Sequence, residues 1–368
     1  MIITTPARIL HVVRQFHPAV GGLEAYVRNM VRHQQGFGHI CEVLTLNRVF
    51  HGQAGDLPPY EIIDGIPVHR VSFLGKRRFF IPLVAPSFFQ GYDIIHVHNT
   101  DGFFDFTSLL AAKSGKPLFA TTHGGFFHTK DYSAIKKIYF NFITRHTGKR
   151  YNALFAISQN DYDTFMGVND NLVLKPNAIV PPGDFMASGN DFVYLGRLAK
   201  HKNIAGLIEA FAHLKITHGV RGKLHIIGPE WDVSRDDLIK LAASLCMGKS
   251  VILHGYVTPE SMERILKGCG WFLSASTFEG FGMSMLEAMA VGLVPFVQPN
   301  ESFRELITAG GVGSCVDFAH PKEAALNIAG KMSDYGPEER DKARSFALRF
   351  SWKQLAEDTL KAYKEFGS

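Results

Sequence analysis

The chain has 368 residues, of which 46% are hydrophobic and 20% are charged. This length suits two domains of about 150–200 residues each, and the composition excludes a mainly disordered, collagen-like or disulfide-stapled protein. The four cysteines are scattered without a C-x-x-C pair, which favours reduced core residues over a zinc site or a disulfide framework.

The positive charge is concentrated in the first half of the chain. The net charge is +5, and the first 180 residues hold 18 Lys and Arg against 12 Asp and Glu. We therefore expect this half to meet an anionic partner. No apolar stretch approaches the roughly 20 residues that cross a bilayer, and no signal peptide is visible, so the sequence predicts a cytoplasmic protein.

Short apolar runs alternate with amphipathic stretches, which indicates parallel α/β sheets. In the first half we expect strands over residues 8–13, 40–46, 67–71, 93–98, 118–121 and 153–157. Helices are expected between them, for example over residues 23–33, 107–114 and 133–146. Residues 176–190 show no periodicity and contain Pro181-Pro182-Gly183, so they predict a linker.

The alternation starts again after this linker. Strands are expected over residues 192–195, 223–227, 251–253, 271–274 and 293–297. Helices are expected over residues 205–215, 236–245, 259–266, 283–290, 302–307, 321–332, 337–348 and 352–366. The pattern predicts two doubly wound, Rossmann-like domains that face a cleft, with ligands at the C-terminal ends of the strands.

Two motifs of the first half follow expected strands. Gly21-Gly22 are expected to open a helix. Glycines have no side chain, so the backbone can approach an anion closely, and the helix N-terminus attracts phosphate. The alternative is an ordinary turn. His123, followed by Gly124-Gly125, directly follows the strand 118–121. A histidine there can hydrogen-bond a substrate hydroxyl or polarise a nearby group, although a structural histidine is the alternative.

Two further motifs lie in the second half. Arg197 and Lys202 bracket a helix start and suit a diphosphate, unless they are merely solvated. Glu279 and Glu287 have seven residues between them, and such carboxylates can accept hydrogen bonds from sugar hydroxyls while the amides of residues 282–284 face an anion. Paired acids also serve glycoside hydrolysis, but the neighbouring phosphate-binding features favour a phosphorylated donor.

Together with Asp-Ile-Ile-His-Val-His at 93–98, these motifs resemble those of retaining glycosyltransferases of family 4 along the whole chain. The resemblance implies the GT-B fold, an α/β architecture of two Rossmann-like doubly wound domains. Residues 1–178 would then bind the acceptor and residues 190–350 the nucleotide-sugar donor. The last helix, 351–366, would pack back onto the first domain.

The resemblance also implies roles for individual residues. Arg197 and Lys202 would bind the diphosphate and stabilise the departing charge, Glu279 would hold the transferred sugar, and Glu287 would hold the ribose hydroxyls. His123 would contact the sugar near the reacting carbon. The other expected donor-binding residues are Gly21, Gly22, Phe281, Gly282, Met283 and Ser284. The transfer would retain the anomeric configuration and need no metal.

Two patterns resemble metal sites. His96 and His98 lie on one face of a strand, but no third ligand is identifiable, which favours a structural role. Asp161-Tyr162-Asp163 matches the D-x-D motif of metal-dependent glycosyltransferases. It follows Ser158, however, and the spacing favours a helix cap.

Basic and aromatic residues are mixed over residues 76–83 and 136–150. Such mixtures suit nucleic acid, an ordinary solvated face, or anionic lipid headgroups with apolar side chains dipping in. We prefer the third alternative, a peripheral association with the inner face of the cytoplasmic membrane, and expect no nucleic acid.

Residues 11–24 and 122–128 resemble most the mannosyltransferases of xanthan- and acetan-type exopolysaccharide synthesis. This resemblance implies GDP-mannose as the nucleotide-diphospho-sugar and a lipid-linked saccharide, a glucosyl-glucosyl-diphosphopolyprenol, as the acceptor. A lipopolysaccharide-core enzyme or a UDP-glucose enzyme is an alternative. A nucleotide-sugar epimerase and a non-catalytic sugar-binding protein are alternatives from other classes.

Overall fold

The computed structural model describes residues 6–19, 21–50, 55–76, 79–111, 113–123 and 138–367. The chain divides into two compact units. The first comprises residues 1–177 together with 352–368, and the second comprises residues 178–351. Among the helices in these ranges, none is both long and apolar enough to cross a membrane.

The first unit is built on a largely parallel sheet. In its described part the strand order is β10-β9-β8-β7-β1-β2-β4-β3, and only β3 runs antiparallel, against β4. The strands are β1 (Arg8–Val13), β2 (Ile40–Leu46), β3 (Tyr60–Ile63), β4 (Ile66–Val71), β7 (Ile94–His98), β8 (Leu118–Thr121), β9 (Ala153–Ala156) and β10 (Leu172–Leu174). The chain leaves β1 towards β2 and returns to the other side of β1 at β7, so the topological switch point lies between β1 and β7.

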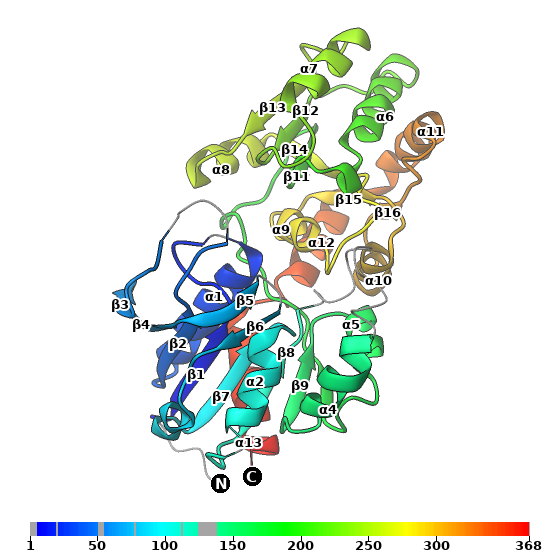
Figure 1. Cartoon of the computed structure of the whole chain (residues 1–368). Coiled ribbons are helices and arrows are strands. Elements are labelled where there is room, and N and C mark those ends of the chain that lie inside the picture. The colour runs from blue at the N-terminus through cyan, green and yellow to red at the C-terminus, as the bar shows by residue number, and fades with distance from the viewer. Residues whose placement is uncertain are drawn as a thin grey trace. The chain divides into compact units, whose positions relative to one another are not determined.

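Helices cover both faces of this sheet. Helices α1 (Gly22–Gly36) and α13 (Trp352–Phe366) pack on one face, and α2 (Gly102–Ala111) and α5 (Gln159–Phe165) pack on the other. Figure 1 shows α2 in front of the sheet and α13, in red, behind it. Because successive strand residues point to opposite faces, Ile9, His11 and Val13 of β1 face the side of α1 and α13.

Short elements of the first unit were not expected from the sequence. They include β3, β10, the 3₁₀ helix η1 (Pro86–Gly91) and a separate hairpin of β5 (Phe73–Lys76) and β6 (Phe79–Pro82). In the hairpin, Gly75 lies within β5 and Pro82 ends β6, and both residue types weaken the pattern of a strand.

Two expected helices of the first unit differ from the structure. The helix expected over 107–114 is α2, which begins earlier because the Asp101 side chain accepts a hydrogen bond from the Phe103 N–H at 3.1 Å. Within the helix expected over 133–146, residues 133–137 lie outside the described residues. The remainder forms the π-helix η2 (Phe140–Thr144) followed by α4 (Arg145–Gly148).

The second unit is a fully parallel sheet with the order β13-β12-β11-β14-β15-β16 among its described strands. These are β11 (Asp191–Leu195), β12 (Leu224–Ile227), β13 (Val251–Gly255), β14 (Cys269–Ser274), β15 (Val294–Val297) and β16 (Ser314–Cys315). Strand β14 returns beside β11, which places the topological switch point between these two strands. All six residues of β14 are buried, as in sheets covered on both faces.

The helices of the second unit agree with the expected ones to within three residues at each end. They are α6 (Ile204–Ile216), α7 (Arg235–Ser244), α8 (Pro259–Lys267), α9 (Met283–Met289), α10 (Glu301–Gly310), α11 (Pro321–Lys331) and α12 (Pro337–Ala347), with the short 3₁₀ helices η3 (Lys200–Lys202) and η4 (Met332–Asp334).

Residues 178–190 contain no helix or strand, yet they pack against the second unit. Ile179 and Ala187 are buried in its core, and the Ala187 N–H donates to the Val291 carbonyl at 2.8 Å. Ile179 also forms a parallel bridge with Ser351. The segment is therefore a fixed part of this unit and not a free linker.

Candidate active site

The loop that carries Arg197 and Lys202 leaves the C-terminal end of β11. It begins at Gly196, whose φ of 151° favours glycine. Gly228, after β12, packs so closely that a Cβ there would lie 2.0 Å from the Gly196 carbonyl oxygen. The Lys200 N–H donates to Asp232 Oδ1 at 2.8 Å. The loop after β11 is thus anchored to the loop after β12.

The Arg197 side chain is held by an aromatic ring. Its guanidinium carbon lies 4.6 Å from the centre of the Trp231 ring, within the range of a cation–π interaction. The Tyr194 hydroxyl donates to the Arg197 carbonyl at 3.0 Å and fixes the backbone at this residue.

Lys202 and Glu279 form an ion pair between two loops. Lys202 Nζ lies 2.6 Å from Glu279 Oε1, and the two side chains are only 14% and 12% exposed. The loops are also joined through their main chains, because the Thr277 N–H donates to the His201 carbonyl at 2.8 Å. Burial and the neighbouring Lys202 charge lower the pKa of His201. We therefore expect a neutral imidazole beside the ion pair.

Glu287 is a carboxylate on α9, in the turn after the helix start. The helix begins after Gly282, whose φ of 91° and close approach to Phe303 exclude a larger residue without strain. Within the described residues, the Glu287 side chain forms no hydrogen bond or ion pair, and burial raises its pKa to about 7. Such a carboxylate has its acceptor positions available for donors from a ligand.

The other expected donor-binding residues of this unit lie at the same helix start. Phe281 packs against Phe350 with a ring-centre distance of 5.7 Å, and Met283 contacts the core. Ser284 is half-buried in the first turn of α9.

In the first unit, Gly21 and Gly22 lie at the start of α1. A Cβ added to Gly22 would meet no atom within 4 Å, whereas a Cβ on Gly21 would lie 2.5 Å from Glu24 Oε2. Packing against the described residues therefore does not require glycine at position 22. Val20, which precedes Gly21, lies outside the described residues.

His123 follows β8 in a left-handed conformation with φ of 55°, which is uncommon for a residue with a Cβ. Its Nε2 lies 3.3 Å from His98 Nδ1, and its ring packs edge-on against Tyr26 at 4.4 Å between ring centres. Burial lowers the pKa of His123 to about 3, so the ring is neutral. Residues 124–128 of this motif lie outside the described residues.

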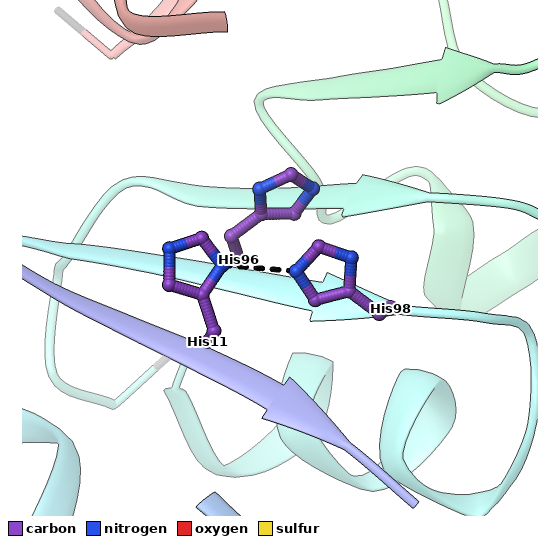
Figure 2. A group of neighbouring side chains, drawn as sticks. All are labelled: His11, His96 and His98. Carbon is purple, nitrogen blue, oxygen red and sulfur yellow. Dashed lines mark hydrogen bonds between the residues drawn. The ribbon is translucent and has the colours of Figure 1, made fainter. Parts of the chain in front are cut away.

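Three buried histidines form a cluster that reaches His123 through His98. His11 of β1 and His96 and His98 of β7 project from adjacent strands towards one another, as Figure 2 shows. His11 Nδ1 lies 2.9 Å from His98 Nε2, and the three residues offer ring nitrogens that all lie within 4.8 Å of one another. His11 therefore supplies the third histidine that the sequence did not identify.

Comparison with known proteins decides the family. The family model for Glycosyltransferase Family 4 matches residues 20–181, and that for Glycosyl transferases group 1 matches residues 183–349. The chain is also 32% identical to a GDP-mannose:cellobiosyl-diphosphopolyprenol alpha-mannosyltransferase of Xanthomonas oryzae pv. oryzae, over 95% of this chain and 94% of the relative. The chain is a family 4 glycosyltransferase.

A second relative agrees with this assignment, and a solved structure shows the same fold. A protein of the same name from Komagataeibacter xylinus is 30% identical to this glycosyltransferase over 97% of the chain and 93% of the relative. The crystal structure of Anabaena Alr3699/HepE in complex with UDP has a TM-score of 0.74 at 16% identity, and covers 97% of this chain and 100% of that one. The family and the GT-B fold predicted from the motifs are confirmed.

Among the expected site residues of this glycosyltransferase, the structure joins Lys202 directly to Glu279 and places Arg197 in the same loop as Lys202. In the described part of the chain, no hydrogen bond or ion pair links Glu287 to these three. The ligand-binding role of each residue stays a prediction.

The D-x-D sequence of the glycosyltransferase is a helix start. Ser158 Oγ accepts a hydrogen bond from the Asp161 N–H at 3.2 Å, which confirms the cap predicted from the sequence. The Asp161 carboxylate accepts from the Ile157 N–H at 3.2 Å and from the Thr122 hydroxyl. Asp163 accepts from the Gln159 side chain at 2.8 Å. Both carboxylates are thus engaged within the protein.

Sequence reasoning missed several residues of the site. Trp231 was not singled out, because its contact with Arg197 depends on the packing of two loops. His11 was missed because only the pairing of β1 with β7 brings it beside His96 and His98. A usable signal existed, since polar residues at inward positions of buried strands need hydrogen-bond partners.

Proposed function

We propose that this glycosyltransferase transfers mannose from GDP-mannose, with retention of the anomeric configuration, to a polyprenyl-diphosphate-linked saccharide in surface polysaccharide synthesis. The observation that carries this proposal is 30–32% identity, over at least 95% of this chain, to three proteins named GDP-mannose:cellobiosyl-diphosphopolyprenol alpha-mannosyltransferase. The acceptor would carry a glucosyl-glucosyl saccharide.

The second unit would bind the donor through its two loops. When the bond between the anomeric carbon and the phosphate oxygen breaks, negative charge develops on the departing diphosphate, and Arg197 and Lys202 supply positive charge to stabilise it. The ion pair with Glu279 holds Lys202 in place before the donor arrives. An arriving diphosphate would compete for Lys202, which frees Glu279 to accept hydrogen bonds from hydroxyls of the transferred sugar.

The acceptor hydroxyl would attack on the face from which the diphosphate leaves, and its proton would pass to the departing phosphate oxygen. Glu287 would accept hydrogen bonds from the ribose hydroxyls, which is supported by its available acceptor positions. In the first unit, Gly22 would lie next to the phosphates, which is supported by the absence of any described atom within 4 Å of a Cβ placed there.

Transfer is proposed to proceed without a metal. The positive charges of Arg197 and Lys202 provide the electrostatic stabilisation that a metal ion would otherwise supply. The carboxylates of Asp161 and Asp163 are engaged in hydrogen bonds within the protein, which argues against their use as metal ligands.

A donor panel tests the function. Purified enzyme would receive GDP-mannose, UDP-glucose, UDP-galactose or UDP-GlcNAc with glucosyl-glucosyl-diphosphopolyprenol, with EDTA present. We expect a trisaccharide lipid from GDP-mannose alone and an α-linkage in the product. A product formed only from UDP-glucose would show that UDP-glucose, not GDP-mannose, is the donor. A change in the donor sugar when no acceptor is present would indicate an epimerase.

We also propose that the first unit associates with an anionic membrane through an apolar groove. Leu74, Ile81 and Leu109 line this groove, which has a volume of about 380 Å³ and runs between the β5–β6 hairpin, α2 and η2. Its rim includes Ile143, and the neighbouring Phe142 is 78% exposed. The exposed cations nearby in sequence are Arg145, Lys149 and Arg150.

The occupant proposed for this groove is the apolar layer of the membrane, because basic residues beside apolar ones complement anionic headgroups. Residues 77, 78, 136 and 137 of the expected basic stretches lie outside the described residues. The enzyme would therefore work at the inner face of the cytoplasmic membrane, close to a diphosphate lipid.

Sedimentation with vesicles tests the association. Phe142→Ser should weaken binding to vesicles that contain phosphatidylglycerol, and the triple variant Lys76/Arg77/Arg78→Ala should abolish it. Tyr256→Ser is the matched control, because Tyr256 is an 85% exposed aromatic residue of the other unit. Equal sedimentation of all four proteins would contradict the proposal.

A further inference from the structure

A buried glutamine determines which atoms donate and which accept in the hydrogen bonds of the histidine cluster. Gln34 of α1 is fully buried, and its Nε2 lies 3.4 Å from the Met30 sulfur, which can only accept a hydrogen bond. On its other side, Gln34 Oε1 faces two groups that can donate, His11 Nε2 at 2.8 Å and the Cys41 thiol at 3.7 Å, which agrees with the amide nitrogen lying towards Met30. Because this oxygen can only accept, His11 carries its proton on Nε2.

The proton positions of the next two histidines follow from that of His11. With Nε2 protonated, neutral His11 can only accept at Nδ1, so His98 donates from Nε2 at 2.9 Å. His98 then accepts at Nδ1, and His123 donates from its Nε2 at 3.3 Å. The hydrogen bonds thus leave His123 with a proton on Nε2 and a lone pair on Nδ1.

A second chain of hydrogen bonds starts at the other end of the same amide. Gln34 Nε2 donates to the Tyr363 hydroxyl at 3.4 Å, and that hydroxyl donates to His96 Nδ1 at 2.5 Å. His96 Nε2 then donates to Thr121 Oγ1 at 2.8 Å. Both ring nitrogens of His11, His96 and His98 are therefore engaged in a consistent set of donors and acceptors.

Burial keeps these rings neutral. Desolvation lowers the pKa of His11 to about 4 and that of His123 to about 3, and it lowers the pKa values of His96 and His98 well below the usual range. A metal ion bound by His11, His96 and His98 would have to displace several of these hydrogen bonds. The cluster shown in Figure 2 therefore fits a hydrogen-bond relay better than a metal site.

We propose that Gln34, His11 and His98 are positioning residues that hold His123 as the Nε2–H tautomer, so that its Nδ1 accepts a hydrogen bond from a hydroxyl of the transferred sugar. The inference rests on the proposed function for the identity of that hydroxyl. The left-handed backbone conformation of His123 is a second indication that the fold holds this ring in one orientation. A relay of buried neutral groups can fix a tautomer because the opposite tautomer would set two donors, or two acceptors, against each other.

The tautomers can be measured on the complete enzyme without any substrate. Long-range ¹H–¹⁵N correlation spectra of the ¹⁵N-histidine protein distinguish Nδ1–H from Nε2–H, and single His→Gln variants assign the signals. We expect neutral Nε2–H forms of His11, His98 and His123 at neutral pH. An Nδ1–H form or a charged ring at any of the three would overturn the relay, as would Zn²⁺ binding that shifts the nitrogens of all three clustered histidines.

The variant Gln34→Met removes the amide that sets the direction of the hydrogen bonds in the relay, and it does not change His123 itself. We expect a mixture of tautomers at His123 and a fall in kcat/KM for the donor of up to about tenfold, with an unchanged KM for the acceptor. Gln35→Met is the matched control, because Gln35 is the next residue of α1 but lies outside the relay.

An unchanged His123 tautomer in Gln34→Met would overturn the proposal that Gln34 sets the direction of these hydrogen bonds. Unchanged donor kinetics despite mixed tautomers would overturn the role in sugar binding. If GDP-mannose proves not to be the donor, only the proposed function fails; the tautomer measurement still decides the relay, and the kinetics are then read with the donor that the panel identifies.

Discussion

Lys202 Nζ lies 2.6 Å from Glu279 Oε1, and this ion pair joins the loop that follows β11 to the loop that follows β14. These loops leave neighbouring strands at the topological switch point of the second sheet, where open α/β sheets bind ligands. The residue expected to bind the diphosphate and the residue expected to bind the sugar therefore hold each other in place before the donor arrives.

Lys202→Ala should lower kcat by about 100-fold or more, because it removes the charge that is expected to lie next to the departing diphosphate. It should also destabilise the second unit by about 1–3 kcal/mol, because Glu279 loses its partner in a poorly solvated place. Steady-state kinetics and urea unfolding measure the two effects. Lys267→Ala is the control, since the Lys267–Glu263 pair has the same 2.6 Å distance but is exposed. Near-normal turnover of Lys202→Ala would contradict its role.

Arg197→Ala should also lower kcat strongly, by about 100-fold, because the guanidinium is expected to stabilise the same charge. Trp231→Ala should have a smaller effect of about two- to fivefold, since it removes only the ring that orients Arg197. The double variant should be no worse than Arg197→Ala alone. Additive losses would mean that Trp231 acts independently of Arg197.

The stability of the second unit should depend on the ionisation of Glu287. Burial raises its pKa from 4.5 to about 7, so the unfolded chain loses this proton at a lower pH than the folded protein does. The contribution to stability is complete below pH 4.5 and is lost as the pH rises towards 7, by up to about 3 kcal/mol. Urea unfolding at about pH 5 and pH 8 measures the difference in the free energy of unfolding between the wild type and Glu287→Gln. A constant difference between them would show that burial does not shift this pKa.

Gly22→Ala should fold normally and bind the donor less well. A Cβ at Gly22 meets no atom of the described residues within 4 Å, so we expect any loss to reflect the proposed approach of the donor to this backbone. We expect an unchanged melting temperature and a KM for the donor raised about tenfold, as when one good contact is lost. Gly36→Ala, an equally open glycine at the other end of α1, should leave both quantities unchanged. An unchanged donor KM in Gly22→Ala would remove this glycine from the donor site.

Much of the second unit could be predicted from the sequence because apolar strands alternate regularly with amphipathic helices along this part of the chain. Strand β14 and helix α6 were expected within two residues of their actual bounds. The hairpin of β5 and β6 was not, because Gly75 and Pro82 interrupt its strand pattern and each strand finds its partner only on folding. Likewise the start of α2 depends on a side-chain cap at Asp101.

The sequence by itself determined the order of the elements, the charged and glycine-rich motifs at the strand ends, and the family. Only the tertiary structure decided that Lys202 pairs with Glu279, that Arg197 lies over Trp231, and that His11 and His98 connect Gln34 to His123. Strand patterns and motifs depend on residues that are close in sequence, so they can be predicted from the sequence alone. Hydrogen bonds between residues such as His11 and His98, which lie 87 positions apart, arise from the register of paired strands, and that register is set by packing of the whole unit.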